Sequence, residues 1–318
     1  MKKLLLAVTS CLVLATGYAV SVSLPAAAQA GAAPAVRTKS SCGTVPVSST
    51  SYTHVIWIWM ENHSYSSIIG SPQAPYINSL AGSCGLATNY HNISHPSLPN
   101  YIAGTSGLSL LNIQQFASDC NPSIACSTSA PSVFGQGESW KSYEDSMPTN
   151  CDTSNAGNYA VRHNPPPYFA TLKGCGTNDV PFTQLRKDLR SNSLPAFSFV
   201  TPDVSHDMHD GTVAQGDTWL SKNLKPILRS SAYRTHKVVV FVTWDEGEGG
   251  SSIGCATNTT DVGCHVATIV VSPSTLAGTK STTLFNHYSL LMTTEQLLGL
   301  PLLGNASTAT SMTSAFNL

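Results

Sequence analysis

Four short apolar runs rich in β-branched residues organise the chain from residue 54 onward. In each run the apolar positions are continuous, which is typical of a strand covered on both faces of a parallel sheet. Segments with helical spacing lie at residues 217–230, where Pro226 predicts a kink, and at 286–298, which begins with the capping residue Asn286. Strands that alternate with helices predict an α/β domain, a layered fold with a mostly parallel central sheet flanked by helices. The four runs are residues 55–60, 197–201, 238–243 and 266–272.

Residues 109–176 interrupt this alternation. The segment is rich in Ser, Asn, Gly and Pro, shows little periodicity and contains four cysteines. Long stretches without a hydrophobic period are typical of inserted loops. We therefore expect one domain over residues 52–318, with residues 109–176 forming an irregular, disulfide-stapled insertion.

The first 30 residues are typical of a secretory signal peptide. Two lysines precede an apolar segment at residues 4–14, and Ala28-Gln29-Ala30 offers a small-residue cleavage site. The apolar segment is shorter than the ~20 residues that a membrane span needs. We expect a secreted protein cleaved near Ala30, with a flexible leader at residues 31–51 and no stable membrane anchor.

Eight cysteines follow the signal segment, and an even number in an exported chain favours disulfides. The connectivity stays open, because eight cysteines allow over a hundred pairings. No Cys-x-x-Cys pair is present, so zinc bound by cysteine is not expected. The nearest neighbours are Cys120 and Cys126, Cys151 and Cys175, and Cys255 and Cys264, which leaves Cys42 and Cys84.

The charge content argues against nucleic acid as a partner. The net charge is −1 and charged residues make up 10% of the chain, well below the ~25% of typical globular domains. The sequence shows no basic cluster large enough to bind a phosphate backbone. We therefore expect no nucleic-acid partner.

Ionisable side chains follow three of the predicted strands. Glu61, Asn62 and His63 end the first, and Asp245 and Glu246 end the third. Each group alone could be a helix cap or a solvated turn. Six of the seventeen acidic residues fall at these strand ends, however, and the carboxyl ends of parallel strands meet in one crevice. This predicts a metal or phosphate site. The loop after the second strand adds Asp203, His206, Asp207, His209 and Asp210.

Ser97 is the candidate nucleophile. Pro96 before it and Pro99 after it predict that Ser97 is the N-cap of a helix. The positive end of the helix dipole, together with a metal held by Glu61, would lower the pKa of the hydroxyl. An ordinary capping serine is the alternative from this stretch alone.

Several phrases resemble the bacterial phosphoesterase family. That family includes secreted acid phosphatases and phospholipases C and belongs to the alkaline-phosphatase-like superfamily. Ser97-Leu-Pro-Asn-Tyr101 followed by Thr105-Ser-Gly107 also resembles the nucleophile motif of nucleotide pyrophosphatase/phosphodiesterases, with Ser97 at the position of their threonine. The phrases are residues 55–65, 74–78, 95–101, 163–165, 202–211, 243–246 and 286–291.

The resemblance implies an alkaline-phosphatase-like fold and a phosphoryl transfer in two displacements through a phosphoserine on Ser97. It implies one or two divalent metal ions. Glu61-Asn62 and Asp245-Glu246 stand where two-zinc relatives carry Asp and Asp-His, so the ligand set is richer in oxygen and the metal's identity and number stay open. The expected roles are metal binding by Glu61, Asn62, Asp245, Glu246 and Asp207, catalysis by Ser97, His95, His206 and His209, and substrate binding by His163, Asn100 and His287.

The hypothesis is a secreted, metal-dependent phosphoesterase that hydrolyses phosphate monoesters. We expect a monomer whose substrate is a small phosphate ester or a phospholipid. Phospholipase C or another phosphodiesterase is the near alternative. A metal-independent serine hydrolase is more distant, because no Gly-x-Ser-x-Gly phrase is present. A non-catalytic binding protein that has kept the fold is the remaining alternative.

Overall fold

The computed structural model describes residues 41–248, 250 and 253–318. The expected signal peptide and residues 31–40 of the expected leader lie outside the described residues. Within the described part, no helix has both the length and the apolar character needed to cross a bilayer.

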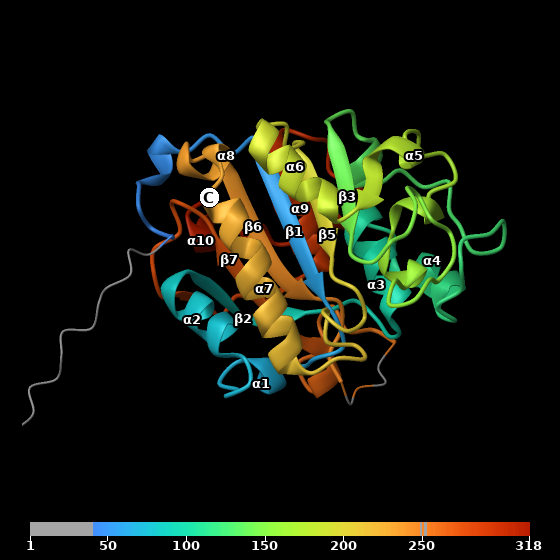
Figure 1. The fold of residues 1–318 in the computed structure, drawn as a ribbon. Coiled ribbons are helices and arrows are strands. Elements are labelled where there is room, and N and C mark those ends of the chain that lie inside the picture. The colour runs from blue at the N-terminus through green and yellow to red at the C-terminus, as the bar shows by residue number, and fades with distance from the viewer. Residues whose placement is uncertain (1–40, 249, 251–252) are drawn as a thin grey trace, which may run out of the picture. The chain divides into compact units, whose positions relative to one another are not determined.

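A mixed sheet forms the centre of the domain (Figure 1). Its strand order is β4-β3-β5-β1-β6-β7-β2-β8, with β9 also paired to β2. Only β7 runs antiparallel to its neighbours among these strands, which confirms the expected mostly parallel sheet. The strands are β1 His54–Met60, β2 Gly85–His91, β3 Trp140–Glu144, β4 Asp179–Pro181, β5 Phe197–Thr201, β6 Val238–Trp244, β7 His265–Val271, β8 Thr279–Ser281 and β9 Phe285–Asn286.

Helices cover both faces of the sheet, with α6 and α7 in front of it and α9 behind it in Figure 1. Helix α7 packs against α2 and α6, whereas α9 packs against α3 and β1. The α-helices are α1 Tyr65–Ile68, α2 Pro75–Ser83, α3 Ser97–Ser106, α4 Leu110–Ile113, α5 Cys175–Asn178, α6 Thr183–Ser191, α7 Val213–Leu228, α8 Ser231–Arg234, α9 His287–Leu298 and α10 Thr313–Phe316. Short 3-10 turns lie at Val47–Ser49, Gln114–Phe116, Val133–Gly135, Val161–His163, Pro166–Tyr168, Val262–Cys264 and Gly304–Thr308.

The two helices with clear sequence signals form where they are expected. Helix α9 follows Asn286, whose side chain accepts hydrogen bonds from the amides of Tyr288 and Ser289. Helix α7 begins at Val213, a few residues earlier than its apolar period indicated, because Thr212 and Gln215 form a capping box there. Pro226 lies inside α7.

The segment 109–176 is less irregular than its composition indicated. Its residues Trp140–Glu144 form β3, which pairs with β5 in the central sheet. Trp140 and Tyr143 are buried there, but polar residues separate them in the sequence and hide the strand. Two disulfides hold the rest of the segment. Three of the four disulfides join nearest neighbours, Cys120–Cys126, Cys151–Cys175 and Cys255–Cys264, and the fourth joins the remaining pair, Cys42–Cys84.

Strand β1 fixes the centre of the molecule. Its residues from Val55 to Met60 are buried, and it lies between β5 and β6 with Met60 opposite Trp244 of β6. Because the two strands are parallel and in this register, the residues that follow them, Glu61 and Asp245, leave the sheet side by side. The amide of Asp245 donates to the carbonyl of Met60 at 2.9 Å, which continues the pairing past the last strand residue.

Glu295 connects α9 to the loop beyond it. The side chain is buried, and its Oε1 accepts a hydrogen bond from the amide of Leu303 at 3.0 Å. Burial raises the pKa of Glu295 to about 7. The folded protein therefore holds this proton more tightly than the unfolded chain does.

We expect the stability contributed by Glu295 to be present at low pH and to fall as the pH rises from 4.5 through 7. Glu295→Gln, which stays neutral, should remove that fall and gain on the order of 2 kcal/mol over wild type above pH 8. Urea unfolding of both proteins across pH 4–9 measures the difference. Parallel curves for the two proteins would contradict the prediction.

Candidate active site

Four buried carboxyl groups gather at the carboxyl edge of the sheet. Glu61 follows β1, Asp245 and Glu246 follow β6, and Asp207 lies in the loop after β5. Because β7 is antiparallel, its first residue, His265, also lies at this edge. The expected convergence of strand ends is thus present, and it concentrates negative charge in the interior.

The carboxyl groups are close enough to affect one another. Burial raises the pKa of Glu61 well above its usual value, and Asp245 and Asp207 raise it further. Burial and then Glu246 raise the pKa of Asp245, and burial raises that of Asp207 and Glu246. Four such groups keep their negative charge near neutral pH only if a cation compensates it.

Ser97 lies against these carboxylates. Its Oγ donates to Oε2 of Glu61 at 3.0 Å and lies 3.5 Å from Oε1 of Glu246. The expected N-cap is one residue off, since Pro96 is the N-cap of α3 and Ser97 is the first helical residue. The hydroxyl is therefore free of its own helix and faces the carboxyl cluster.

Tight packing of α3 on β1 sets the place of Ser97. A Cβ on Gly104 would come within 2.7 Å of the Trp59 ring, so the helix approaches the strand closely only because residue 104 is glycine. Tyr101, one turn after Ser97, donates from its hydroxyl to Oε1 of Glu61. Helix and strand are therefore joined by packing and by a polar contact at the site itself.

His163 joins two of the carboxylates. Its Nε2 lies 3.2 Å from Oε1 of Glu61, and its Nδ1 lies 3.1 Å from Oδ2 of Asp207. Burial, then the charge of Arg162, lowers its pKa well below the usual value, so the imidazole is neutral at pH 7. A neutral imidazole at this place is a possible metal ligand.

His95 and His209 lie at the accessible side of the cluster. Nδ1 of His95 pairs with Glu246 at 2.6 Å, and its Nε2 has no partner. His209 is held on both nitrogens, since Nε2 lies 3.1 Å from Arg162 and Nδ1 lies 2.7 Å from Asp210. Of these two imidazoles, only His95 has a ring nitrogen without a hydrogen-bond partner, and this Nε2 is buried.

Two of the residues expected at the site have other surroundings. His206 bonds through Nδ1 to Asp145 and Asp203, both at 3.0 Å, and it forms a separate cluster with them. Asn100 is buried, and its side chain holds the backbone of residues 93–96. The contacts of His206 and Asn100 are therefore with structural partners and not with the carboxyl cluster.

His287 lies beneath the carboxyl cluster. It is fully buried against Trp59, and its Nε2 donates to the carbonyl of Asp245 at 2.7 Å. Tyr90 fixes the other ring nitrogen from 3.1 Å. The contact orients the backbone that carries Asp245, which places His287 as a positioning residue.

Sequence reasoning missed Tyr101, Arg162 and Asp119. Tyr101 follows Ser97 by four residues, a helical spacing that puts both on one face and was a usable signal. Arg162 precedes His163 directly. Asp119 accepts a hydrogen bond from the amide of Leu98 at 2.9 Å, and only the folded loop brings it there.

The chemistry of the donor set fits a divalent cation. The carboxyl group of Asp245 is fully buried, and its Oδ1 accepts a hydrogen bond from the Asn62 amide at 3.1 Å. The Asn62 backbone has a φ of 53°, which asparagine tolerates better than most residues and which turns the chain beside Asp245. Glu61, His163 and His209 each also offer one possible ligand atom, and these three atoms lie within 4.8 Å of one another.

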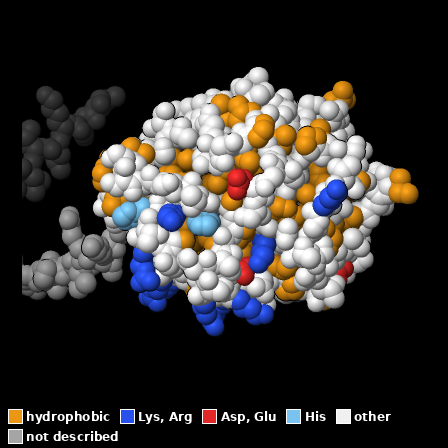
Figure 2. Space-filling view, turned by 90° about the horizontal axis from the view of Figure 1, so that it is seen from above, with side chains coloured by type: hydrophobic (Ala, Val, Ile, Leu, Met, Phe, Trp, Pro, Cys, Tyr) orange, Lys and Arg blue, Asp and Glu red, His pale blue; other side chains and the backbone are white. Residues whose placement is uncertain are grey.

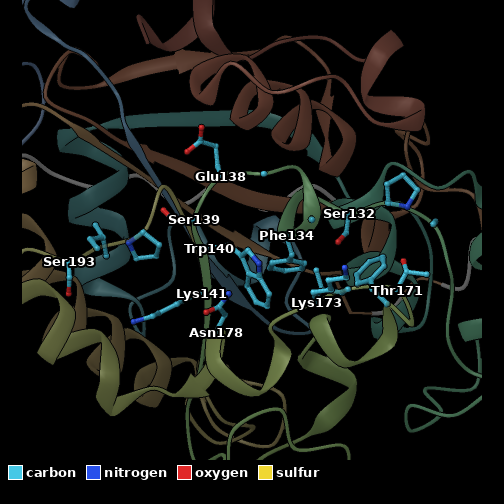
Figure 3. A pocket seen from close by; sticks show the side chains of 18 residues that line it. Ser132, Phe134, Glu138, Ser139, Trp140, Lys141, Thr171, Lys173, Asn178 and Ser193 are labelled. Carbon is cyan, nitrogen blue, oxygen red and sulfur yellow. The ribbon is translucent and has the colours of Figure 1, made fainter.

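A separate pocket of about 690 Å³ lies away from this cluster (Figure 3). It is lined by side chains such as Phe134, Trp140 and Lys141, from the start of β3 and the insertion. Since β3 is parallel to β1, the start of β3 marks the opposite edge of the sheet. The pocket includes none of the candidate catalytic residues.

The model of the Phosphoesterase family matches residues 71–301. A Mycobacterium tuberculosis phosphatidylinositol-3-phosphatase is 32% identical over 267 residues, 82% of each chain. A phosphate-repressible acid phosphatase of Penicillium chrysogenum is 29% identical and is matched over 95% of this chain and 72% of its own.

Solved structures show the same fold at low identity. A protein in the alkaline phosphatase superfamily from Vibrio parahaemolyticus superposes with a TM-score of 0.57 at 13% identity, over 86% of this chain and 73% of its own. Murine ectonucleotide pyrophosphatase/phosphodiesterase 5 gives 0.55 at 10% identity, over 79% and 96%. The expected alkaline-phosphatase-like fold is confirmed.

Gly104→Ala tests the close approach of α3 to β1. The added methyl group must displace Trp59 or the helix, so we expect a loss of about 1–3 kcal/mol in the free energy of unfolding. Gly82→Ala in α2 is the matched control, because a Cβ there meets nothing within 4 Å. That variant should be neutral or slightly stabilised. Equal changes in the free energy of unfolding for the two variants, measured with urea, would show that α3 does not pack tightly against Trp59.

Proposed function

The chain belongs to the phosphoesterase family, and we propose that it is a metal-dependent phosphomonoesterase acting through a phosphoserine on Ser97. Its membership makes it a hydrolase of phosphoric ester bonds. The observation that carries the finer proposal is the Ser97 hydroxyl, which points into a cluster of four buried carboxyl groups. The four disulfides support secretion.

The residues that would hold the cation are Glu61, Asp245 and Glu246 around Ser97, with Asn62 beside them. Glu61 is shared with a second group formed by His163 and His209, and Asp207 anchors this group. A divalent cation bound there would neutralise the carboxylates, lower the pKa of the serine hydroxyl and offset charge on the phosphate. The oxygen-rich set leaves one or two ions possible.

The chain's own groups support two displacements. The hydroxyl of Ser97 already donates toward Glu61, so the proton has a destination as the Oγ–P bond forms and the ester P–O bond breaks. His95, oriented by Glu246, has a free Nε2 to protonate the departing alkoxide. Water then attacks phosphorus and returns a proton to His95, the Oγ–P bond breaks, inorganic phosphate leaves, and Ser97 recovers its proton from Glu61.

Arg162 supplies positive charge near the attacking hydroxyl. Its partly exposed guanidinium lies beside His209 at 3.1 Å and attracts the nearby carboxyl of Asp119. Guanidinium groups match the geometry of phosphate oxygens. Arg162 is therefore our choice for the group that orients the substrate phosphate.

A monoester substrate is favoured over a diester. The Mycobacterium tuberculosis relative is named a phosphatidylinositol-3-phosphatase, and the fungal relatives are named acid phosphatases. Both names describe removal of a terminal phosphate. Phospholipase C activity stays the alternative within the same site.

Ser97→Ala should lower kcat for p-nitrophenyl phosphate by about 1000-fold or more, because the nucleophile is lost. Ser106→Ala is the control on the same helix, where the hydroxyl bonds to the carbonyl of Ile102. Rapid acid quenching of the wild type followed by mass spectrometry should find phosphate on Ser97. Faster turnover of bis-p-nitrophenyl phosphate would select the diesterase alternative, and full activity of Ser97→Ala would refute the mechanism.

Chelation should abolish turnover, and a divalent cation should restore it. At about 100 times its Kd, the ion should stabilise the protein by about 2.7 kcal/mol, roughly 5 °C or more in Tm. Asp245→Asn removes one charge but keeps an acceptor for the Asn62 amide, so it should raise the Tm of the chelated protein and shrink the gain from metal. Activity that survives exhaustive chelation would favour a metal-independent serine hydrolase instead.

A further inference from the structure

A basic groove lies between α6, α7 and α8, with a volume of about 810 Å³. Half of the chain's sixteen Lys and Arg residues lie between positions 186 and 237. Six of them line this groove, and all six are exposed. They are Arg186, Arg190, Lys222, Lys225, Arg229 and Arg234.

No carboxylate balances these charges. Across the described residues, the Lys and Arg side chains form one salt bridge, between Lys141 and Asp188, and it uses the acid of α6. Residues 218–237 contain no Asp or Glu. Arg186 donates to the Asn223 amide oxygen at 3.2 Å, which leaves its charge unpaired. Six like charges around one hollow repel each other, so the groove favours an anion.

Helix dipoles explain only part of the cluster. Cations stabilise the last turn of a helix, and Arg190, Lys225 and Arg234 occupy such positions. Arg186 and Lys222 lie further back along their helices, where the dipole effect has faded. They nevertheless face the same groove, so the groove itself is the common feature.

The groove is remote from the catalytic cluster. Lys225 and Arg229 lie at the end of α7, on the side where β6 begins, whereas Asp245 follows the end of β6. The seven residues of β6 span roughly 20 Å. Figure 2 shows Lys and Arg side chains gathered along the lower edge of the face seen there. A ligand in the groove therefore does not enter the active site.

The lining selects among anionic partners. It contains no aromatic side chain on which a nucleobase could stack. None of the exposed large hydrophobic residues belongs to it, so it offers nothing to insert into a bilayer. The cations come from α6 on one side and from α7, α8 and the turn between them on the other. The remaining lining is Leu189, Asn192, Pro226, Ser230 and Ser231.

We propose that the basic groove binds a linear chain of phosphate groups, such as inorganic polyphosphate, at a site separate from catalysis. The long cationic side chains contact successive phosphates, and Arg forks bind two oxygens each. Binding there holds the enzyme on a polyanion with its active edge free. The inference stands independently of the reaction proposed for Ser97.

The test is fluorescence polarisation of end-labelled inorganic polyphosphate, with Ser97→Ala in every protein so that the probe is not hydrolysed. Lys225→Gln/Arg229→Gln should weaken binding at least tenfold and reduce the slope of log K against log salt by about 1.4. Lys173→Gln/Lys280→Gln, which removes two exposed cations elsewhere, should change binding less than twofold. With Ser97 intact, the groove variant should keep wild-type turnover of p-nitrophenyl phosphate.

If both double variants weakened polyphosphate binding equally, the protein would attract the probe through its overall charge, and the proposed groove site would be wrong. Full displacement of the probe by inorganic phosphate at concentrations that inhibit turnover would place binding in the active site. Tighter, groove-dependent binding to phosphatidylglycerol vesicles or to single-stranded DNA would replace the proposed partner. Each of these outcomes is separate from the fate of the phosphoserine mechanism, which the turnover of Ser97→Ala decides.

Discussion

Repulsion among four buried carboxyl groups is the constraint on which the catalytic end of this domain depends. Glu61, Asp207 and Asp245 are fully buried, and Glu246 is nearly so. Burial weakens solvent screening of these groups, and the guanidinium of Arg162 lies at the partly exposed rim. Protonation would relieve the repulsion, but protonated carboxyl groups could neither bind a metal ion nor accept the serine proton. A divalent cation would relieve the repulsion and would also activate the adjacent hydroxyl. The same ion would therefore serve both the stability of the cluster and the hydrolysis of a phosphoester.

The rest of the fold holds that arrangement in place. The register of β1 with β6 sets Glu61 beside Asp245, and the loop after β5 is tied to it because the amide of Glu61 donates to the carbonyl of Asp207 at 2.9 Å. Helix α3 carries Ser97 to the carboxyl cluster, and Gly104 lets this helix pack closely against Trp59. A small movement of that helix would separate the hydroxyl from both carboxylates.

The sequence predicted the parts that depend on local pattern. Continuous apolar runs located β1, β5, β6 and β7, and the abrupt change to Glu61 and Asp245 located the buried carboxyl cluster. The sequence could not place β3, because polar residues flank the buried Trp140 along the chain. It also could not show that β7 is antiparallel. His206 and His163 look equivalent in the sequence, and only the fold puts His163 against Glu61. Likewise, a net charge of −1 conceals a groove of six cations, because composition averages over faces that the fold separates.

Anomalous X-ray scattering from crystals of the purified protein soaked with Mn²⁺ tests the central claim most directly. The account predicts a peak bounded by oxygens of Glu61, Asp245 and Glu246 and within reach of Ser97 Oγ, and predicts that Asp245→Asn weakens it. An ordered wild-type site without a peak, in protein that still hydrolyses phosphate esters, would contradict the account.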